Sequence, residues 1–511
     1  MAPDRGGDGR AGAAGGHRLD FSTMLKRLIA AARTAISFSL RLWGQVPRSG
    51  PGCPPSGGEG LVPWGSRWWR ALAGSCLAFS ITTPHLLADD WPHWLGPQRD
   101  SVWREKGIVE TFPAEGPQVR WRTAIGGGFA GPAVTEGRVY VTDHQLAPGA
   151  TNPKDPFAKG MIPGKERVLC LDEKSGKQLW SYEYDCPYTM SYPSGPRTTP
   201  SVERGRVYCL GAEGNLFCLD AASGKPIWAH NLNSEYGAKT PLWGYAAHPL
   251  VEGDQVFSLV GGEGSAVVAF DRESGKELWR ALSAKEIGYS PPILIEHNGR
   301  RQLIVWHPES VNALDPVTGK VEWTVPFSSR MGLSVATARK ADDLLFFTAF
   351  YDGSLALRLS ADQPQIVWKS KKASEKDTDG LHSIIPTPFL EDGYIYGVCS
   401  YGQLRCLRAD TGERIWETFK ATTTDGKELR WGNAFLVKNG SRFFLFNEQG
   451  DLIIARLSPK GYEEISRVHC LEPTNPDPGR AVVWSHPAFA NRSMYARNDR
   501  EIVCISLAKG K

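Results

Sequence analysis

Tryptophan recurs at a nearly constant interval through the middle of this chain. Six members of the series are separated by 48, 51, 44, 45 and 48 positions, and they are Trp180, Trp228, Trp279, Trp323, Trp368 and Trp416. In five of the six, the tryptophan ends a phrase that begins with Ser-Gly-Lys, Thr-Gly-Lys or Thr-Gly-Glu, as in Ser-Gly-Lys-Gln-Leu-Trp at 175–180. A period of about 40–50 residues indicates a repeat architecture.

One repeat, residues 199–228, divides into short apolar segments that are separated by turns rich in Gly and Asp. Such segments are typical of β-strands joined by hairpins. Glycine suits the turns because it adopts positive φ without strain. Four antiparallel strands in each repeat predict the blade of a β-propeller.

Eight such units can be counted, and their first strands follow Gly131, Thr199, His248, Ser290, Ser334, Thr387, Asn433 and His486. The last unit, 486–507, has room for only three strands, and the segment 118–123 resembles an orphan fourth strand. Pairing of this segment with the last unit would close the ring and remove exposed sheet edges. We therefore predict an all-β, eight-bladed propeller closed by an N-terminal strand; the alternative is seven blades.

The repeated tryptophans are predicted to be structural. Each lies at the same place in the outer strand of its unit, where it can bury roughly 150–250 Å² against the next blade. The predicted structural series is Trp121, Trp180, Trp228, Trp279, Trp323, Trp368 and Trp416.

The first 88 residues differ from the rest. Residues 1–60 are rich in Gly, Arg and Ala, which favours disorder or a start codon assigned too early, with translation beginning near residue 61. Residues 61–88 join basic residues to an apolar stretch and a small residue, which predicts a signal peptide cleaved after Ala88. Lipid attachment at Cys76 is the alternative. The stretch is too interrupted for a transmembrane span.

The basic balance of the chain comes from this leader. Residues 1–88 hold 10 of the 59 basic and 4 of the 55 acidic residues, which leaves residues 89–511 with a net charge of −2. Such a balance gives no electrostatic reason to expect binding of nucleic acid.

Eight cysteines fall within residues 89–511. Cys170, Cys218 and Cys406 share one repeat position that other units fill with Ala, which predicts a small buried site for a free thiol. An exported protein could instead form disulfides within two hairpins, Cys209 with Cys218 and Cys399 with Cys406. No pattern typical of a metal site occurs, so none is predicted.

The repeated phrase resembles the pyrroloquinoline quinone (PQQ) repeat of quinoprotein dehydrogenases and of BamB, the propeller lipoprotein of the outer-membrane assembly machine. The resemblance covers about residues 91–507, and further segments are similar to a bacterial family of exported propellers. It implies a periplasmic or envelope protein, expected to be a monomer. It allows PQQ with calcium as a cofactor but firmly implies none, because the chain has no adjacent pair of cysteines and is short for a quinoprotein dehydrogenase.

In a propeller, the loops that lead into the innermost strands gather around one mouth of the channel, and a concave mouth is the usual ligand site. Aromatic and Arg side chains are common in binding hot spots. The candidates are Arg197, Trp243, Tyr245, His248, Tyr289, Arg330, His382, Arg430, Trp431, Asn433, Trp484 and His486. Alternatively, these side chains fill the channel and pair with neighbouring backbone.

Catalytic residues remain unknown from the sequence, although Asp143 and His144 are the one pair that suggests acid–base chemistry. The insertion 143–165 is expected to project beside the mouth as a lid or partner contact. The sequence thus favours a non-catalytic scaffold that binds a protein, peptide or polysaccharide of the cell envelope. The alternative is a PQQ- or metal-dependent dehydrogenase with its site at the mouth.

Overall fold

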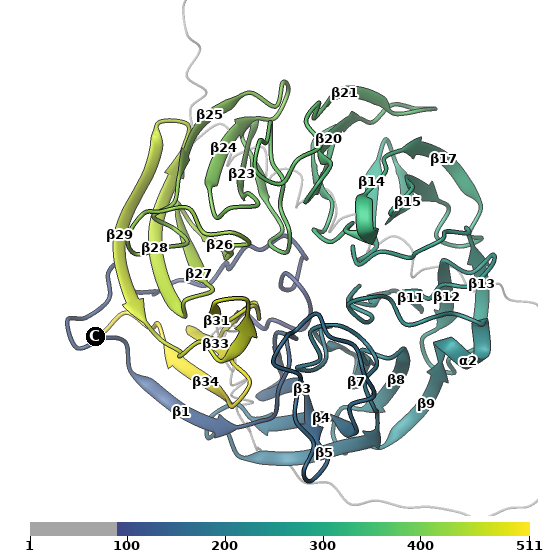
Figure 1. The fold of residues 1–511 in the computed structure, drawn as a ribbon, viewed down its shortest axis with the longest axis horizontal. Coiled ribbons are helices and arrows are strands. Elements are labelled where there is room, and N and C mark those ends of the chain that lie inside the picture. The colour runs from purple at the N-terminus through teal and green to yellow at the C-terminus, as the bar shows by residue number, and fades with distance from the viewer. Residues whose placement is uncertain (1–88, 511) are drawn as a thin grey trace, which may run out of the picture. The chain divides into compact units, whose positions relative to one another are not determined.

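The computed structural model describes residues 89–510, which form eight four-stranded antiparallel sheets arranged as a ring (Figure 1). The predicted eight-bladed propeller is therefore confirmed, and the seven-bladed alternative is wrong. The predictions for residues 1–88 lie outside the described residues: disorder or a misplaced start, the signal peptide, cleavage after Ala88 and lipid attachment at Cys76.

Within a blade the strands follow chain order from the centre of the ring outward. Blade 1 contains β2 (Ala133–Thr135), β3 (Arg138–Leu146), β4 (Gly164–Asp172) and β5 (Gln178–Asp185). Blade 2 contains β6 (Ser201–Glu203), β7 (Arg206–Leu210), β8 (Asn215–Asp220) and β9 (Pro226–Asn231). Blade 3 contains β10 (Leu250–Glu252), β11 (Gln255–Leu259), β12 (Val267–Asp271) and β13 (Glu277–Ala281). Blade 4 contains β14 (Ile293–His297), β15 (Arg300–His307), β16 (Ser310–Leu314) and β17 (Val321–Pro326).

The second half of the ring repeats this plan. Blade 5 contains β18 (Arg339–Ala341), β19 (Leu344–Ala349), β20 (Gly353–Arg358) and β21 (Gln365–Lys369). Blade 6 contains β22 (Phe389–Glu391), β23 (Tyr394–Val398), β24 (Leu404–Arg408) and β25 (Arg414–Thr418). Blade 7 contains β26 (Ala434–Asn439), β27 (Arg442–Asn447), β28 (Asp451–Ser458) and β29 (Gly461–His469).

Blade 8 combines the two ends of the described chain. Its inner strands are β32 (Ala488–Ala490), β33 (Ser493–Arg497) and β34 (Glu501–Ser506), and its outer strand is β1 (Val119–Ala124). β1 runs antiparallel to β34, with Thr123 opposite Ile502. The predicted closure by the segment 118–123 is confirmed.

Few elements lie outside the blades. A short helix, α2 (Leu232–Tyr236), a 3₁₀ turn, η1 (Arg330–Gly332), and a hairpin of β30 (Asn475–Asp477) and β31 (Arg480–Val482) sit in loops between blades. None of the described helices has the length and hydropathy of a membrane span.

The repeated tryptophans lie between blades. Trp180 of blade 1 packs against the turn of blade 2, where its ring is so close that a Cβ added to Gly224 would lie 2.5 Å from it. Its indole N–H donates to the carbonyl oxygen of Ala221 at 3.1 Å. Six of the seven tryptophans make this bond to the next blade, at 2.8–3.1 Å. The repeated tryptophans thus lie in the contacts between neighbouring blades.

The cysteines follow the same register. Cys170, Cys218 and Cys406 each lie directly opposite the tryptophan of their own blade, and all eight cysteines of the described residues are buried and free. The disulfide alternative is wrong because the partners face opposite sides of a blade: Cys209 packs in the cluster between blades 1 and 2, and Cys218 in the cluster between blades 2 and 3. Cys399 and Cys406 are divided in the same way.

Residues 91–109, here called the N-terminal segment, run across the inner strands before the chain enters β1. Trp91 exchanges backbone hydrogen bonds with Val134 of β2 at 2.7 and 2.8 Å, and the Arg99 guanidinium donates to the Val251 carbonyl of β10 at 2.7 Å. Arg339 of β18 donates to the carbonyl oxygens of residues 99 and 100 at 3.1 Å. Contacts with blades on opposite sides of the ring hold this segment across the centre.

Candidate functional site

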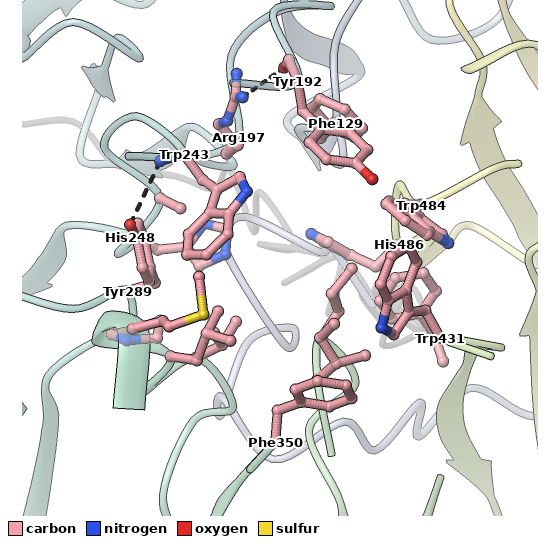
Figure 2. A pocket seen from close by; sticks show the side chains of 18 of the residues that line it. Phe129, Tyr192, Arg197, Trp243, His248, Tyr289, Phe350, Trp431, Trp484 and His486 are labelled. Carbon is pink, nitrogen blue, oxygen red and sulfur yellow. Dashed lines mark hydrogen bonds between the residues drawn. The ribbon is translucent and has the colours of Figure 1, made fainter. Parts of the chain in front are cut away.

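A cavity of about 450 Å³ opens where the loops between blades converge on the centre of the ring (Figure 2). Its wall is formed by 22 residues, of which eleven are aromatic: Trp94, Phe129, Phe157, Tyr192, Trp243, Tyr289, Phe350, Tyr351, Trp431, Phe435 and Trp484. The lining contains no Asp, Glu, Asn, Gln, Ser, Thr, Cys or Lys side chain. The site is therefore an aromatic pocket, here called the mouth cavity.

The aromatic wall is built from loops that join one blade to the next. Trp243 precedes β10 and lies edge-on to Tyr289, which precedes β14, with ring centroids 5.9 Å apart. On the other side of the cavity, Trp484 precedes β32 and packs against Tyr192 at 5.8 Å (Figure 2). Aromatic contacts of this kind stabilise by about 0.5–1.5 kcal/mol beyond the area that they bury, so the loops hold one another in place.

Tyr192 is held in a strained conformation, with φ of +53°. Its hydroxyl donates to Asp477 Oδ1 at 3.0 Å, which ties the loop of blade 2 to the β30–β31 hairpin. Glu448 accepts from Arg480 of this hairpin at 2.8 Å and from the Trp484 indole at 2.9 Å. A polar layer behind the wall thus fixes its aromatic rings.

The floor of the cavity consists of Trp94, His248 and His486. Trp94 comes from the N-terminal segment; its ring stacks on His248 at 4.2 Å and lies edge-on to His486 at 4.1 Å. The indole N–H donates to the Thr337 hydroxyl at 2.8 Å. The N-terminal segment therefore supplies a part of the cavity floor that the repeats do not.

Both floor histidines are neutral. His248 Nδ1 accepts from the Thr199 backbone N–H at 2.8 Å, so its proton is on Nε2, and His486 Nε2 lies 2.7 Å from the Thr199 hydroxyl. Burial lowers the pKa of His248 well below its usual value and that of His486 to about 3. A charged imidazolium is excluded from this apolar environment.

Two arginines supply the charge of the cavity. Arg430 lies 4.3 Å above the Trp431 ring and pairs with Glu375 at 2.7 Å. The Arg197 guanidinium donates to the carbonyl oxygens of Ser191 and Tyr192 at 3.0 and 2.6 Å.

Eight of the twelve predicted mouth residues line this cavity: Arg197, Trp243, His248, Tyr289, Arg430, Trp431, Trp484 and His486. The structure brings them together from five different inter-blade loops. Whether they bind a ligand stays a prediction.

The other four do not line the cavity. Tyr245 turns into the core, where its hydroxyl donates to the Val260 carbonyl at 2.9 Å. His382 is fully buried between the carbonyl oxygens of residues 350 and 379. Asn433 is fully buried, with its backbone N–H bonded to Glu448. Arg330 is drawn away by Asp352, which accepts from its Nε at 2.9 Å. These four match the alternative prediction, in which polar groups pair with neighbouring loops.

The pair suggested for acid–base chemistry belongs to blade 1. Asp143 is fully buried and accepts from Arg167 Nε at 2.9 Å, and His144 stacks on Tyr188 at 3.9 Å. Burial lowers the pKa of His144 to about 4. Neither residue lines the mouth cavity. The loop within the expected insertion 143–165 is shorter than predicted, because β3 and β4 extend into the insertion from both sides. Phe157, from the middle of this loop, lines the cavity.

Seven of the eleven aromatic residues of the wall were not among the candidates from the sequence, including Trp94, Phe129, Phe350 and Phe435. Phe129 lies two positions before Gly131, as Trp484 lies two positions before His486, so the offset that located Trp484 would also have found it. Trp94 and Phe350 occupy no comparable position, and no sequence signal points to them.

The lining does not fit PQQ held by calcium. Calcium takes six to eight oxygen ligands, mostly carboxylates and carbonyls, and no carboxylate lines the cavity. Within residues 89–510, no cluster of three or more His, Cys, Asp or Glu side chains could hold a metal ion. The aromatic walls would accept a planar ring, but the donors for its metal are not there.

The fold and this cavity define a β-propeller of the quinoprotein-repeat type. A family model described as outer membrane protein assembly factor BamB matches residues 164–418 and 263–511, and the chain belongs to this family.

Curated relatives carry the same name. The BamB of Yersinia pestis is 27% identical over 210 residues, which cover 40% of this chain and 48% of that protein. The BamB of Burkholderia pseudomallei is 29% identical over 152 residues, 28% of this chain and 38% of that protein. The chain thus spans about half the length, or less, of the curated relatives that it matches.

Solved structures share the fold at low identity. The quinohemoprotein alcohol dehydrogenase of Comamonas testosteroni matches with a TM-score of 0.55 and 14% identity, over 83% of this chain and 81% of that one. A europium-containing methanol dehydrogenase matches with a TM-score of 0.54 and 12% identity, over 82% and 89%. At such identities the likeness shows the architecture alone.

Proposed function

We propose that this chain is a non-catalytic binding protein of the bacterial cell envelope, which holds an apolar segment of a partner protein in the mouth cavity. The observation that carries this proposal is the lining itself: eleven aromatic side chains and no carboxylate, hydroxyl of Ser or Thr, thiol or amine. Aromatic anchors in a concave site are typical of binding hot spots. The lining lacks the Ser, Thr, Cys, Lys, Asp and Glu side chains that serve as nucleophiles in most covalent catalysis, and of the usual nucleophiles it retains only Tyr and His.

The chemistry of the wall favours a protein segment over a polysaccharide. A sugar chain carries hydroxyls along its whole length, and each hydroxyl loses water on binding and needs a replacement partner. The cavity offers few: three tyrosines, two neutral histidines and two arginines. Aromatic and aliphatic side chains of a peptide require no such partners.

The placement in the envelope rests on the relatives, which are named as outer membrane protein assembly factors. We expect an exported monomer, cleaved after Ala88, that acts as a rigid scaffold. The intact mass of the protein recovered from the envelope tests the cleavage: a polypeptide beginning at Asp89 is expected, and a lipid-modified one beginning at Cys76 would refute it.

Site-specific photo-crosslinking in the source bacterium tests the proposed function. A benzoylphenylalanine replaces Phe157 or Met331, which line the cavity and are 43% and 55% exposed. The matched control is Val317, an apolar residue 72% exposed in the outer turn of blade 4. We expect discrete protein adducts from both mouth positions and none of the same size from position 317. Identical adducts from all three positions, or adducts from none, would refute the proposal.

A dehydrogenase that uses PQQ is the second candidate, and only the shared architecture supports it. A ligand at 100 times its dissociation constant stabilises the native state by about 2.7 kcal/mol. For a chain of this size this corresponds to about 3 °C in the unfolding midpoint. Because the lining does not fit the metal, we expect no shift with PQQ and calcium; a clear upward shift would revive the dehydrogenase.

A further inference from the structure

Arg197 is a cation of the mouth cavity without an anionic partner. Its guanidinium donates to the carbonyl oxygens of Ser191, Tyr192 and Gly195, and it lies 5.0 Å from the centre of the Phe129 ring. It forms no ion pair with any carboxylate of residues 89–510, and its Nε–H donates to none of their atoms. Carbonyl dipoles orient the guanidinium but leave its full positive charge in place.

The carboxylates near Arg197 are committed elsewhere. Glu166 accepts from Tyr188 at 2.5 Å and from the Ala212 backbone N–H at 2.9 Å. Glu213 accepts from the backbone N–H of Thr189 at 2.7 Å and from the Thr240 hydroxyl at 2.5 Å. Neither can turn toward Arg197 without leaving these donors unsatisfied.

The rest of the lining does not offset this charge. Arg430, the other lining cation, is already paired with Glu375, and the two floor histidines carry no charge at neutral pH. No carboxylate lines the wall. The mouth cavity therefore combines an apolar aromatic interior with one positive charge that no carboxylate contacts directly.

We infer that the mouth cavity selects a ligand in which a carboxylate is joined to an apolar, preferably aromatic, body, and that Arg197 receives the carboxylate. This inference rests on the proposed function and adds to it the chemistry of the bound end. A volume of about 450 Å³ has room for such a group of two or three residues' size. Guanidinium groups bind carboxylates through charge-assisted hydrogen bonds, which strengthen in a poorly solvated site.

Titration calorimetry of the full chain tests the preference without any substitution. The probes are 4-phenylbutyrate and its uncharged amide, which share one shape and differ by one charge. We expect the acid to bind about tenfold more tightly, the lower end of the range for a hydrogen bond to a charged group. We expect the preference to shrink as salt rises from about 0.05 to 0.5 M. Equal affinities, or no binding of the acid at millimolar concentration, would overturn the inference.

Three variants assign the charge to its residue. Arg197→Gln should remove the preference and leave the affinity for the amide unchanged, while Arg197→Lys should keep part of it. The control is Arg358→Gln, a half-exposed arginine of β20 that pairs with Asp343 on the surface. A preference that survives Arg197→Gln would refute the assignment.

The amide also reports on the integrity of the loop, since Arg197 anchors its carbonyls. If Arg197→Gln weakens the binding of both the acid and the amide, Arg197→Lys, which keeps the positive charge, is the deciding variant. Loss of the preference for the acid in Arg197→Lys as well would refute the role of the charge.

A peptide arm distinguishes the two sources of the carboxylate. N-acetyl-Ala-Phe as the free acid represents a chain terminus, and 4-phenylbutyrate represents a small organic acid; each is compared with its own amide. A larger preference for the peptide acid points to a partner's C-terminus, and a larger preference for phenylbutyrate points to a free acid. If the amides bind and mouth crosslinks form but no preference exists, this inference fails while the proposed function stands.

Discussion

The contribution of each tryptophan contact to stability can be measured by substituting glycines with Ala. The chain suits this comparison because a blade contains two glycines with similar backbones, and only one of them contacts the tryptophan. In blade 2, Gly224 and Gly205 both have left-handed backbones, with φ of +71° and +72°. A Cβ on Gly224 would lie 2.5 Å from the Trp180 ring, whereas a Cβ on Gly205 would meet nothing within 4 Å. Substitution by Ala costs the same backbone strain at both positions, and only one of them disturbs the contact between blades.

The expected magnitudes follow from these distances. Ala in a left-handed conformation costs roughly 1–2 kcal/mol, which both variants share. Forcing a methyl group into a packed ring adds roughly 1–3 kcal/mol at Gly224 alone. With an unfolding entropy of about 2.1 cal/mol/K per residue, a chain of this size loses about 1 °C per kcal/mol. Gly224→Ala should therefore melt about 1–3 °C below Gly205→Ala.

Five blades offer the same comparison, which removes the uncertainty of a single pair. The glycines that contact a tryptophan ring are Gly176, Gly224, Gly275, Gly319 and Gly412, and their open counterparts in the same blades are Gly137, Gly205, Gly253, Gly299 and Gly393. The assay is differential scanning calorimetry of ten single Ala variants. A mean difference between the two sets near zero would refute the view that the tryptophan–glycine contacts hold the blades together.

Three further predictions concern the floor, the histidines and the thiols. Trp94→Ala should deepen the cavity, so that 8-phenyloctanoate gains affinity relative to 4-phenylbutyrate in calorimetry; an unchanged ratio would show that Trp94 is not the floor. His486 has a pKa of about 3 when folded and about 6.5 when unfolded, so between these pH values its imidazole is protonated in the unfolded chain and neutral in the folded chain. The contribution of His486 to the free energy of unfolding is complete above pH 6.5 and is lost as the pH falls toward 3. The free energy of unfolding in urea should therefore differ less between pH 4 and pH 8 for His486→Gln than for the native protein. An equal difference in the two proteins would contradict this. The eight thiols of the described residues should resist dithionitrobenzoate in the native state and react fully in guanidinium; a disulfide found by mass spectrometry would contradict the register.

The blades could be predicted from the sequence because their signals are local. A turn glycine with positive φ and a tryptophan at a fixed distance behind it recur within a few residues of each other, so the count needs no long-range information. Closure by residues 118–123 was also predictable, since a ring with one strand missing has only one place for an orphan strand.

The mouth could be predicted only in part. Trp243 and Tyr245 are two residues apart in one loop, yet one lines the cavity and the other packs in the core, because an irregular loop lacks the alternation that a strand imposes. Trp94 could not be predicted for another reason: the N-terminal segment is positioned by distant residues. Trp94 bonds Thr337, 243 positions further along the chain, and Ser101 bonds Arg339, 238 positions further along. Long-range contacts of this kind leave no periodic trace.

The pairing of β1 with β34 also determines when the newly synthesised chain can complete its fold. Arg122 and Glu501 are bonded across a separation of 379 residues, so β1 leaves the ribosome long before its partner exists. At about 5–20 residues per second, this wait lasts roughly 20–75 s. Throughout that time β1 has no ladder to join and the growing arc of blades has two open edges. The ring closes only after β34 is complete, so this strand is the last element that the eight-bladed fold requires.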